Sequence, residues 1–189
     1  AQERDRSAWA LNVSGAYTFA STRWTPNLGL GYVHYSGEEA GGTNGTDDID
    51  AWDNMFRGSF TTAISDFLAG ADSTGTTAGL YTTFDANDTG ANTNRQMLYV
   101  DAGLKPLQDL DVQARLTFIW FDENPVSGRD DEAGQELDVS ATWDYTEDVQ
   151  FGLLGAFFFP GDYYSGAATA ATRGDNTAWS VSGDVTVNF

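Results

Sequence analysis

A strict alternation of apolar and polar side chains constrains this chain more than any other feature of its sequence. Between residues 178 and 189 every odd position holds an apolar residue or glycine, and every even position holds a small or polar residue. Successive side chains of a β-strand point to opposite faces, so this period of two predicts a strand with one apolar face. The last position of this segment is Phe189, an aromatic residue that we interpret as a carboxy-terminal assembly signal.

The same alternation recurs along the chain. We expect further strands at residues 9–19, 27–35, 98–105, 110–121, 136–145 and 149–159, of which 27–35 alternates less regularly. No segment has the length or the apolar character of a membrane-spanning helix, and none has a convincing helical period. The sequence therefore predicts an all-β, antiparallel chain of about seven or eight strands, the eighth being a candidate near residues 76–84.

The connections between these segments alternate in length. Residues 20–25, 105–109 and 146–148 form short connections, whereas 36–96, 122–134 and 161–176 are long and rich in Gly, Asp, Asn and Thr. If the strands are counted back from Phe189, every short connection falls at one end and every long one at the other. Transmembrane β-barrels of bacterial outer membranes have this asymmetry, with short periplasmic turns and long extracellular loops.

Aromatic residues gather near the ends of the expected strands, as they do at membrane interfaces. They are Trp9, Tyr17, Phe19, Trp120, Trp143, Tyr145, Phe157, Phe159, Trp179 and Phe189. A soluble β-sandwich or barrel alternates in the same way with its apolar face inward, and it is the competing interpretation. We predict one domain, residues 1–189, that forms a transmembrane β-barrel or the carboxy-terminal segment of a larger one, with residues 36–96 as a long extracellular loop.

Composition excludes several classes of function. The chain has 9 Lys and Arg against 28 Asp and Glu, no Cys and a single His. Without a basic patch a nucleic-acid partner is not expected, and without Cys there is no thiol catalysis, disulfide or cysteine zinc site. Phosphate-binding loops, hydrolase elbows and metalloprotease motifs do not occur either. We expect no enzyme activity and no cofactor, and we interpret His34 as an interfacial side chain at an outer strand end.

In a barrel the polar positions of these strands line the interior. The candidate pore-lining residues are Asp101, Lys105, Asp111, Gln113, Arg115, Glu136, Asp138, Asp144 and Asp184. Lys105 and Arg115 stand beside carboxylates of adjoining strands, where they form either a charged constriction that sorts solutes or an ion-pair network that stiffens the wall. The excess of carboxylates predicts that the lumen attracts cations and repels anions.

The long loop 36–96 contains two candidate features. Asp47, Asp48, Asp50 and Asp53 supply oxygen ligands at a density that suits Ca²⁺, although their spacing departs from the EF-hand loop. A solvated acidic loop is the alternative. The mixed stretch 51–68 contains several apolar residues and is a candidate for a short helix or plug inside the pore, or for an external binding surface.

Several short motifs resemble the alginate-export family of outer-membrane porins. They are PNLGLGY at 26–32, YSGE at 35–38, WDNMF at 52–56, GQELD at 134–138 and FFFPGD at 157–162. The resemblance runs in order over most of the chain and is loose between residues 60 and 94. It implies a large barrel of even strand number in a Gram-negative outer membrane, of which these strands would be the carboxy-terminal part.

The expected function is passive passage of hydrophilic solutes or oligosaccharides through a porin-like channel. The expected partners are the lipids of the outer membrane and either the remaining strands of the barrel or other subunits. A small structural barrel that presents acidic extracellular loops to a partner protein is the alternative. The family resemblance implies a polyanionic polysaccharide as cargo, whereas the carboxylates of the candidate lumen predict a preference for cations.

Overall fold

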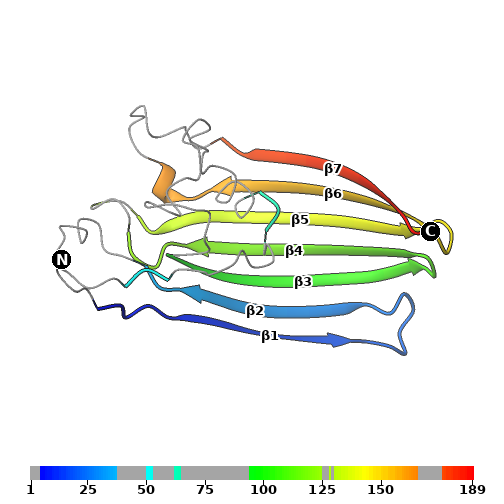
Figure 1. Ribbon diagram of the computed structural model, residues 1–189, viewed down its shortest axis with the longest axis horizontal. Coiled ribbons are helices and arrows are strands. Elements are labelled where there is room, and N and C mark those ends of the chain that lie inside the picture. Colours follow the sequence, from blue (N-terminus) through cyan, green and yellow to red (C-terminus); the bar gives the residue numbers. More distant parts are fainter. Residues whose placement is uncertain are drawn as a thin grey trace.

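A computed structural model of the chain describes residues 5–37, 50–52, 62–64, 94–124, 128, 130–165 and 176–189. The strands are β1 (Ala10–Thr18), β2 (Asn27–Tyr35), β3 (Arg95–Leu107), β4 (Leu110–Trp120), β5 (Glu132–Asp144), β6 (Val149–Pro160) and β7 (Ala178–Val187). They form one antiparallel sheet in the order β1 to β7, in which each strand pairs with its neighbour in sequence (Figure 1). The expected all-β class and the seven strands are confirmed.

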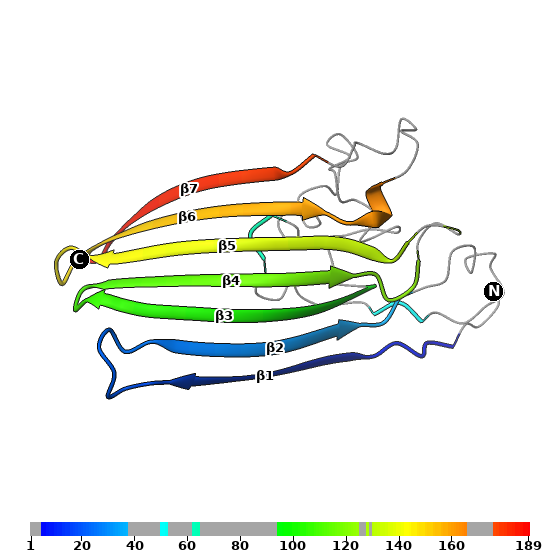
Figure 2. The same ribbon diagram turned by 180° about the vertical axis from the view of Figure 1, so that it is seen from behind.

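The short connections β1–β2, β3–β4 and β5–β6 lie together at the end of the sheet that also holds the carboxy terminus (Figures 1 and 2). We call this end of the sheet the turn end. The opposite end, where β2 ends and β3 begins, is the loop end.

Two strands begin earlier than expected, β3 at Arg95 and β5 at Glu132. The register shifts at Trp120, and Ala133 and Gly134 are both buried, so the alternation that marks a strand is broken there. The proposed eighth strand near 76–84 lies outside the described residues.

The sheet is open. β1 and β7 occupy its two edges and do not pair with each other, so a closed barrel is not shown by the described strands. Since all six pairings are antiparallel, β1 and β7 run in the same direction. No helix in the described part of the chain is long and apolar enough to cross a membrane.

One side of the sheet, which we call the apolar face, is exposed on β1 and β7 and half-buried on β4. It carries the odd positions of β1, β5, β6 and β7 and the even positions of β2, β3 and β4, as the cross-strand register requires. Leu153 in the middle of β6 is 57% exposed, Val185 on β7 is 58% exposed and Trp179 is 70% exposed. The apolar side chains of these strands are therefore not the interior of a sandwich, which would bury them against a second layer.

The opposite side, the polar face, holds the small core of the described structure. Val33, Met97, Ile119 and Phe158 come from β2, β3, β4 and β6 near the loop end and are buried there. Ile64 and the 3₁₀ helix η2 (Asp162–Tyr164) pack onto this patch, with the rings of Phe121 and Tyr163 4.5 Å apart. Connecting segments thus cover part of the polar face, and this apolar patch is a feature that the alternation alone did not predict.

Candidate functional site on the polar face

A row of charged side chains crosses the middle of the polar face. The register aligns Asp101 on β3 with Arg115 on β4 and Arg115 with Asp138 on β5. Arg115 donates two hydrogen bonds to Asp101, from Nε to Oδ1 at 2.6 Å and from Nη2 to Oδ2 at 3.0 Å. Its guanidinium also lies 4.3 Å from the centre of the Tyr99 ring, within cation–π range. The forked geometry and the ring fix the position of this cation.

Residues 62–64 of the long connection lie across this face. The backbone N–H of Ala63 donates to Asp138 Oδ2 at 3.2 Å, and that of Ile64 donates to Glu136 Oε1 at 2.5 Å. Thr62 and Ile64 are buried, and Ile64 belongs to the apolar patch. Of the stretch 51–68, this described part folds onto the polar side of the sheet rather than away from it, and two carboxylates hold it there.

A pocket of about 700 Å³ lies between this segment and the strands. Thr62 and Ala63 form one side, and the row of Asp101, Arg115 and Asp138 forms the other. The remaining polar lining consists of Asn27, Gln113, Ser140, Ser180 and Ser182. The volume falls in the range of about 300–1,000 Å³ that is usual for small-molecule sites. The pocket is our candidate functional site.

The other candidate pore-lining residues lie on the same face but nearer the turn end. The Lys105 ammonium is 3.4 Å from Asp111 Oδ2, with both side chains partly exposed, and Gln113 Nε2 donates to Asp111 Oδ1 at 2.5 Å. Asp144 accepts a hydrogen bond from Gln150 Nε2 at 2.7 Å. The contacts of Lys105 with Asp111 and of Asp144 with Gln150 join neighbouring strands, whereas that of Gln113 with Asp111 lies within β4. Lys105, Asp111 and Asp144 do not line the pocket.

Asp184 of β7 is exposed, and its carboxylate lies over Gly152 of β6, where a side chain on residue 152 would collide with it. Every candidate lining residue therefore shares the polar face, but only Asp101, Gln113, Arg115 and Asp138 line the pocket. Sequence reasoning missed Ser140, Ser180 and Ser182. The signal was present, because all three are small hydroxylated residues at the polar positions of the alternation.

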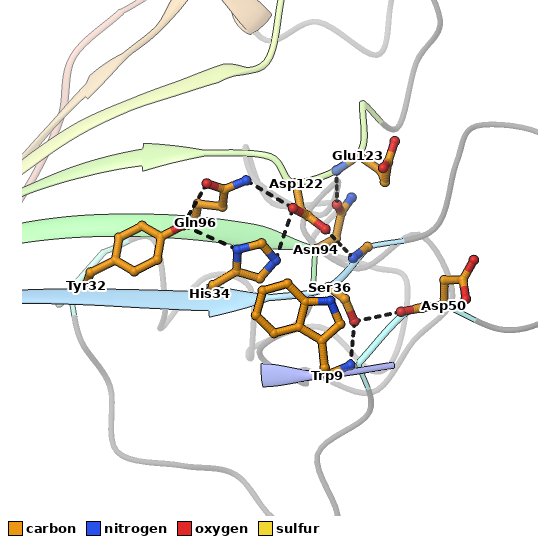
Figure 3. A network of polar contacts seen from close by, with 10 residues as sticks. Trp9, Tyr32, His34, Ser36, Asp50, Asn94, Gln96, Asp122 and Glu123 are labelled. Atoms are coloured by element: carbon orange, nitrogen blue, oxygen red, sulfur yellow. Dashed lines mark hydrogen bonds and ion pairs between the residues drawn. The ribbon is translucent and has the colours of Figure 1, made fainter. Parts of the chain in front are cut away.

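A second polar network lies at the loop end of β2 and β3 (Figure 3). Tyr32 donates from its hydroxyl to Gln96 Oε1 at 2.8 Å, and Gln96 Nε2 donates to Asp122 Oδ1 at 3.0 Å. His34 lies between them, and its ring stacks on Trp9 with centroids 4.0 Å apart. His34 lies near the end of β2, as its place in the sequence predicts. In the structure an acid from a distant part of the sequence, Asp122, lies beside it.

The remaining candidates are less defined. Of the proposed Ca²⁺ ligands only Asp50 is described, and its backbone carbonyl accepts the hydroxyl hydrogen of Ser36 at 2.7 Å. Asp47, Asp48 and Asp53 lie outside the described residues. Among the residues that the structure does describe, no three His, Asp or Glu side chains are grouped to hold a metal ion. Phe189 is fully exposed beyond the end of β7.

Comparison with known proteins adds no family to this geometry. No protein-family model matches the chain, and a search of the curated proteins found no match.

Proposed function

We propose that this chain forms part of the wall of a β-barrel channel in a Gram-negative outer membrane. Small hydrophilic solutes pass through this channel without chemical change. The observation that carries the proposal is the division of the sheet into two faces. The exposed face is apolar, whereas the face on which connecting segments fold is polar and charged. A contiguous apolar surface of this extent marks contact with lipid or another protein.

The dimensions of the apolar face favour lipid. The strands have 9 to 13 residues, and about 9–11 residues are enough to cross a bilayer as a tilted strand. On β6 the exposed rings of Phe151 and Phe159 lie near opposite ends. They are separated by about 26 Å along the strand, or about 20 Å in height at a tilt of about 40°. Aromatic rings at both ends of an apolar band are typical of outer-membrane barrels.

The direction of the edge strands bears on how the wall closes. β1 and β7 run the same way, so pairing them directly would create a parallel seam. Two copies inserted in the same orientation would create two such seams. Bacterial barrels are antiparallel throughout, and hydrocarbon requires every edge to be paired. We therefore propose that strands in addition to the seven described here complete the wall, and that their number is odd.

The proposal is tested on the protein purified in its native assembly from outer membranes. We expect Trp143 and Trp179 to be quenched by brominated lipids after reconstitution, because both are exposed on the apolar face. We also expect stepwise current increases in planar bilayers. Unquenched tryptophans would refute membrane insertion. Quenching without current steps would refute the channel and favour a structural barrel that presents acidic loops to a partner protein.

A further inference from the structure

The pocket on the polar face has an unbalanced charge. Asp101 and Arg115 neutralise each other through their paired hydrogen bonds. Asp138 has no ion pair within the described part of the chain. Its Oδ2 accepts the N–H of Ala63, and its carboxyl group lies beside that of Glu136 and is acted on by the charge of Arg115, but no N–H of a described residue donates to Oδ1. A carboxylate oxygen withdrawn from water without a donor is unfavourable, so the pocket is complementary to one positively charged donor.

The surroundings of Asp138 strengthen this preference for a cation. Glu136 lies two residues away on the same face and interacts electrostatically with Asp138. Glu136 is buried, and its carboxylate holds the N–H of Ile64. Two like charges on one face of a strand repel each other, and a bound cation offsets that repulsion. An anion in the pocket would meet the Asp138 carboxylate, with the buried Glu136 two residues behind it.

The pocket also offers hydroxyl groups, from Ser140 two residues beyond Asp138 on β5 and from Ser180 and Ser182 on β7. Ser140, Ser180 and Ser182 line the pocket, and their hydroxyls form no hydrogen bond with the described residues. The register places Ser180 of β7 beside Ala156 of β6 and Ala156 beside Asp138 of β5. Adjacent strands are about 4.8 Å apart, so Asp138 and Ser180 are separated by about 9.6 Å across a small floor residue. That span accommodates one sugar-sized ring with a hydrogen bond of about 2.8 Å at each end.

We infer that this pocket binds a small, hydroxyl-rich solute that carries a primary ammonium group, of the chemical class of amino sugars. Asp138 binds the ammonium, and Ser140, Ser180 and Ser182 bind the hydroxyls. The volume of about 700 Å³ is far larger than a bare metal ion needs. The inference rests on the proposed channel, since it names the solute class that the channel selects.

Three probes of matched size separate the alternatives. Glucosamine is cationic, glucose is neutral and glucuronate is anionic, and each is titrated calorimetrically against the native assembly in detergent at constant ionic strength. We expect glucosamine to bind at least about tenfold more tightly than glucose, as a charged hydrogen bond implies, and glucuronate to bind most weakly. Equal binding of the three probes, or preference for glucuronate, would overturn the inference. Displacement of glucosamine by an equal concentration of Mg²⁺ would also overturn it.

Two variants and one control variant locate the site. Asp138→Asn should abolish the preference for glucosamine over glucose, whereas Asp184→Asn, on the same face but outside the pocket, should leave it intact. The double variant Ser180→Ala with Ser182→Ala keeps the carboxylate and should weaken glucosamine and glucose alike. Unchanged discrimination in Asp138→Asn would overturn the assignment, and so would full affinity in the serine variant.

Failure of this inference differs from failure of the channel. Current steps and quenched tryptophans without discrimination among the sugars would refute the pocket and leave the channel. Discrimination that depends on Asp138, in a protein that shows no current steps, would keep the pocket and refute the channel.

Discussion

His34 Nε2 lies 3.1 Å from Asp122 Oδ1, and this contact joins β2 to the segment that follows β4. The two side chains are only 10% and 17% exposed. Asp122 also accepts hydrogen bonds from Gln96 Nε2 at 3.0 Å and from the N–H of Gly37 at 2.9 Å. One carboxylate therefore contacts groups from β2, β3 and the connection that leaves β2. These contacts hold the loop ends of β2, β3 and β4 together.

Asp122→Ala should lower the free energy of unfolding by about 2–3 kcal/mol, because its donors lose their acceptor in a site with little water. Denaturant unfolding in detergent, followed by tryptophan fluorescence, measures the change. Asp184→Ala is the matched control, since that carboxylate is exposed and accepts no hydrogen bond from the described residues. Its effect should stay within about 0.5 kcal/mol. Similar losses in both variants would refute the role given to Asp122.

Two glycines of neighbouring strands offer a second matched pair. A side chain on Gly31 of β2 would meet the Tyr99 ring, with the nearest atom 2.1 Å away, whereas one on Gly15 of β1 would meet nothing within 4 Å. Tyr99 is nearly buried and supports Arg115, so it cannot move without loss of that contact.

Gly31→Ala should therefore destabilise the protein by about 1–3 kcal/mol, the usual range for overpacking. Gly15→Ala should change stability by less than about 0.5 kcal/mol, as expected for an exposed site. The midpoint of urea unfolding reports both. If Gly31→Ala is as stable as Gly15→Ala, the Tyr99 ring does not occupy the position described.

Much of the fold follows from alternation alone. The strand around Val185 keeps a period of two without interruption, and those around Val112 and Leu153 keep it over most of their length; the bounds of all three agree with the structure within a few residues. The period fails where a bulge or a covered patch changes which positions are buried. Near Ala133 and Gly134 two consecutive residues are buried, so the start of β5 could not be found from periodicity.

The pocket was only partly predictable. Asp101, Arg115 and Asp138 stood out because charged side chains on the polar positions of adjacent strands are neighbours once the register is known. The register itself depends on the connections and the bulges, and no local pattern gives it. The contact of Ala63 with Asp138 joins residues 75 positions apart. Long-range contacts of this kind leave no local signal in the sequence.

Removal of the fixed cation of the pocket should change ion selectivity. Arg115→Met leaves Asp101 without its partner and removes the positive charge of the row, which makes the net charge of the lining more negative by one unit, so permeation should shift toward cations. We expect the cation-to-anion permeability ratio to rise by about threefold, since one unit charge in a confined site changes the potential by an amount on the order of kT. The reversal potential in a KCl gradient measures this ratio.

Lys105→Met is the control for Arg115→Met, because it removes the same charge from an exposed ion pair at the turn end. Water and salt screen that position more strongly, so its effect on the ratio should be smaller. Equal shifts in the two variants would mean that the row at Arg115 is not the narrow, charged part of the path.

The two faces of the sheet are tested most directly by neighbouring residues of β6. Leu153 is exposed on the apolar face, whereas Leu154 lines the pocket on the polar face. If the apolar face contacts lipid, Leu153→Arg places a charge near the middle of the bilayer and should cost about 2–4 kcal/mol. Leu154→Arg places the same charge in an aqueous interior, and this variant should fold and insert nearly as well as the unmodified protein.

The yield of folded protein in lipid vesicles, read from its resistance to protease, compares the Leu153→Arg and Leu154→Arg variants. In a water-soluble sheet Leu153→Arg would be harmless, because an arginine at an exposed site is well solvated. Equal tolerance of arginine at both positions would therefore refute the assignment of the apolar face to lipid.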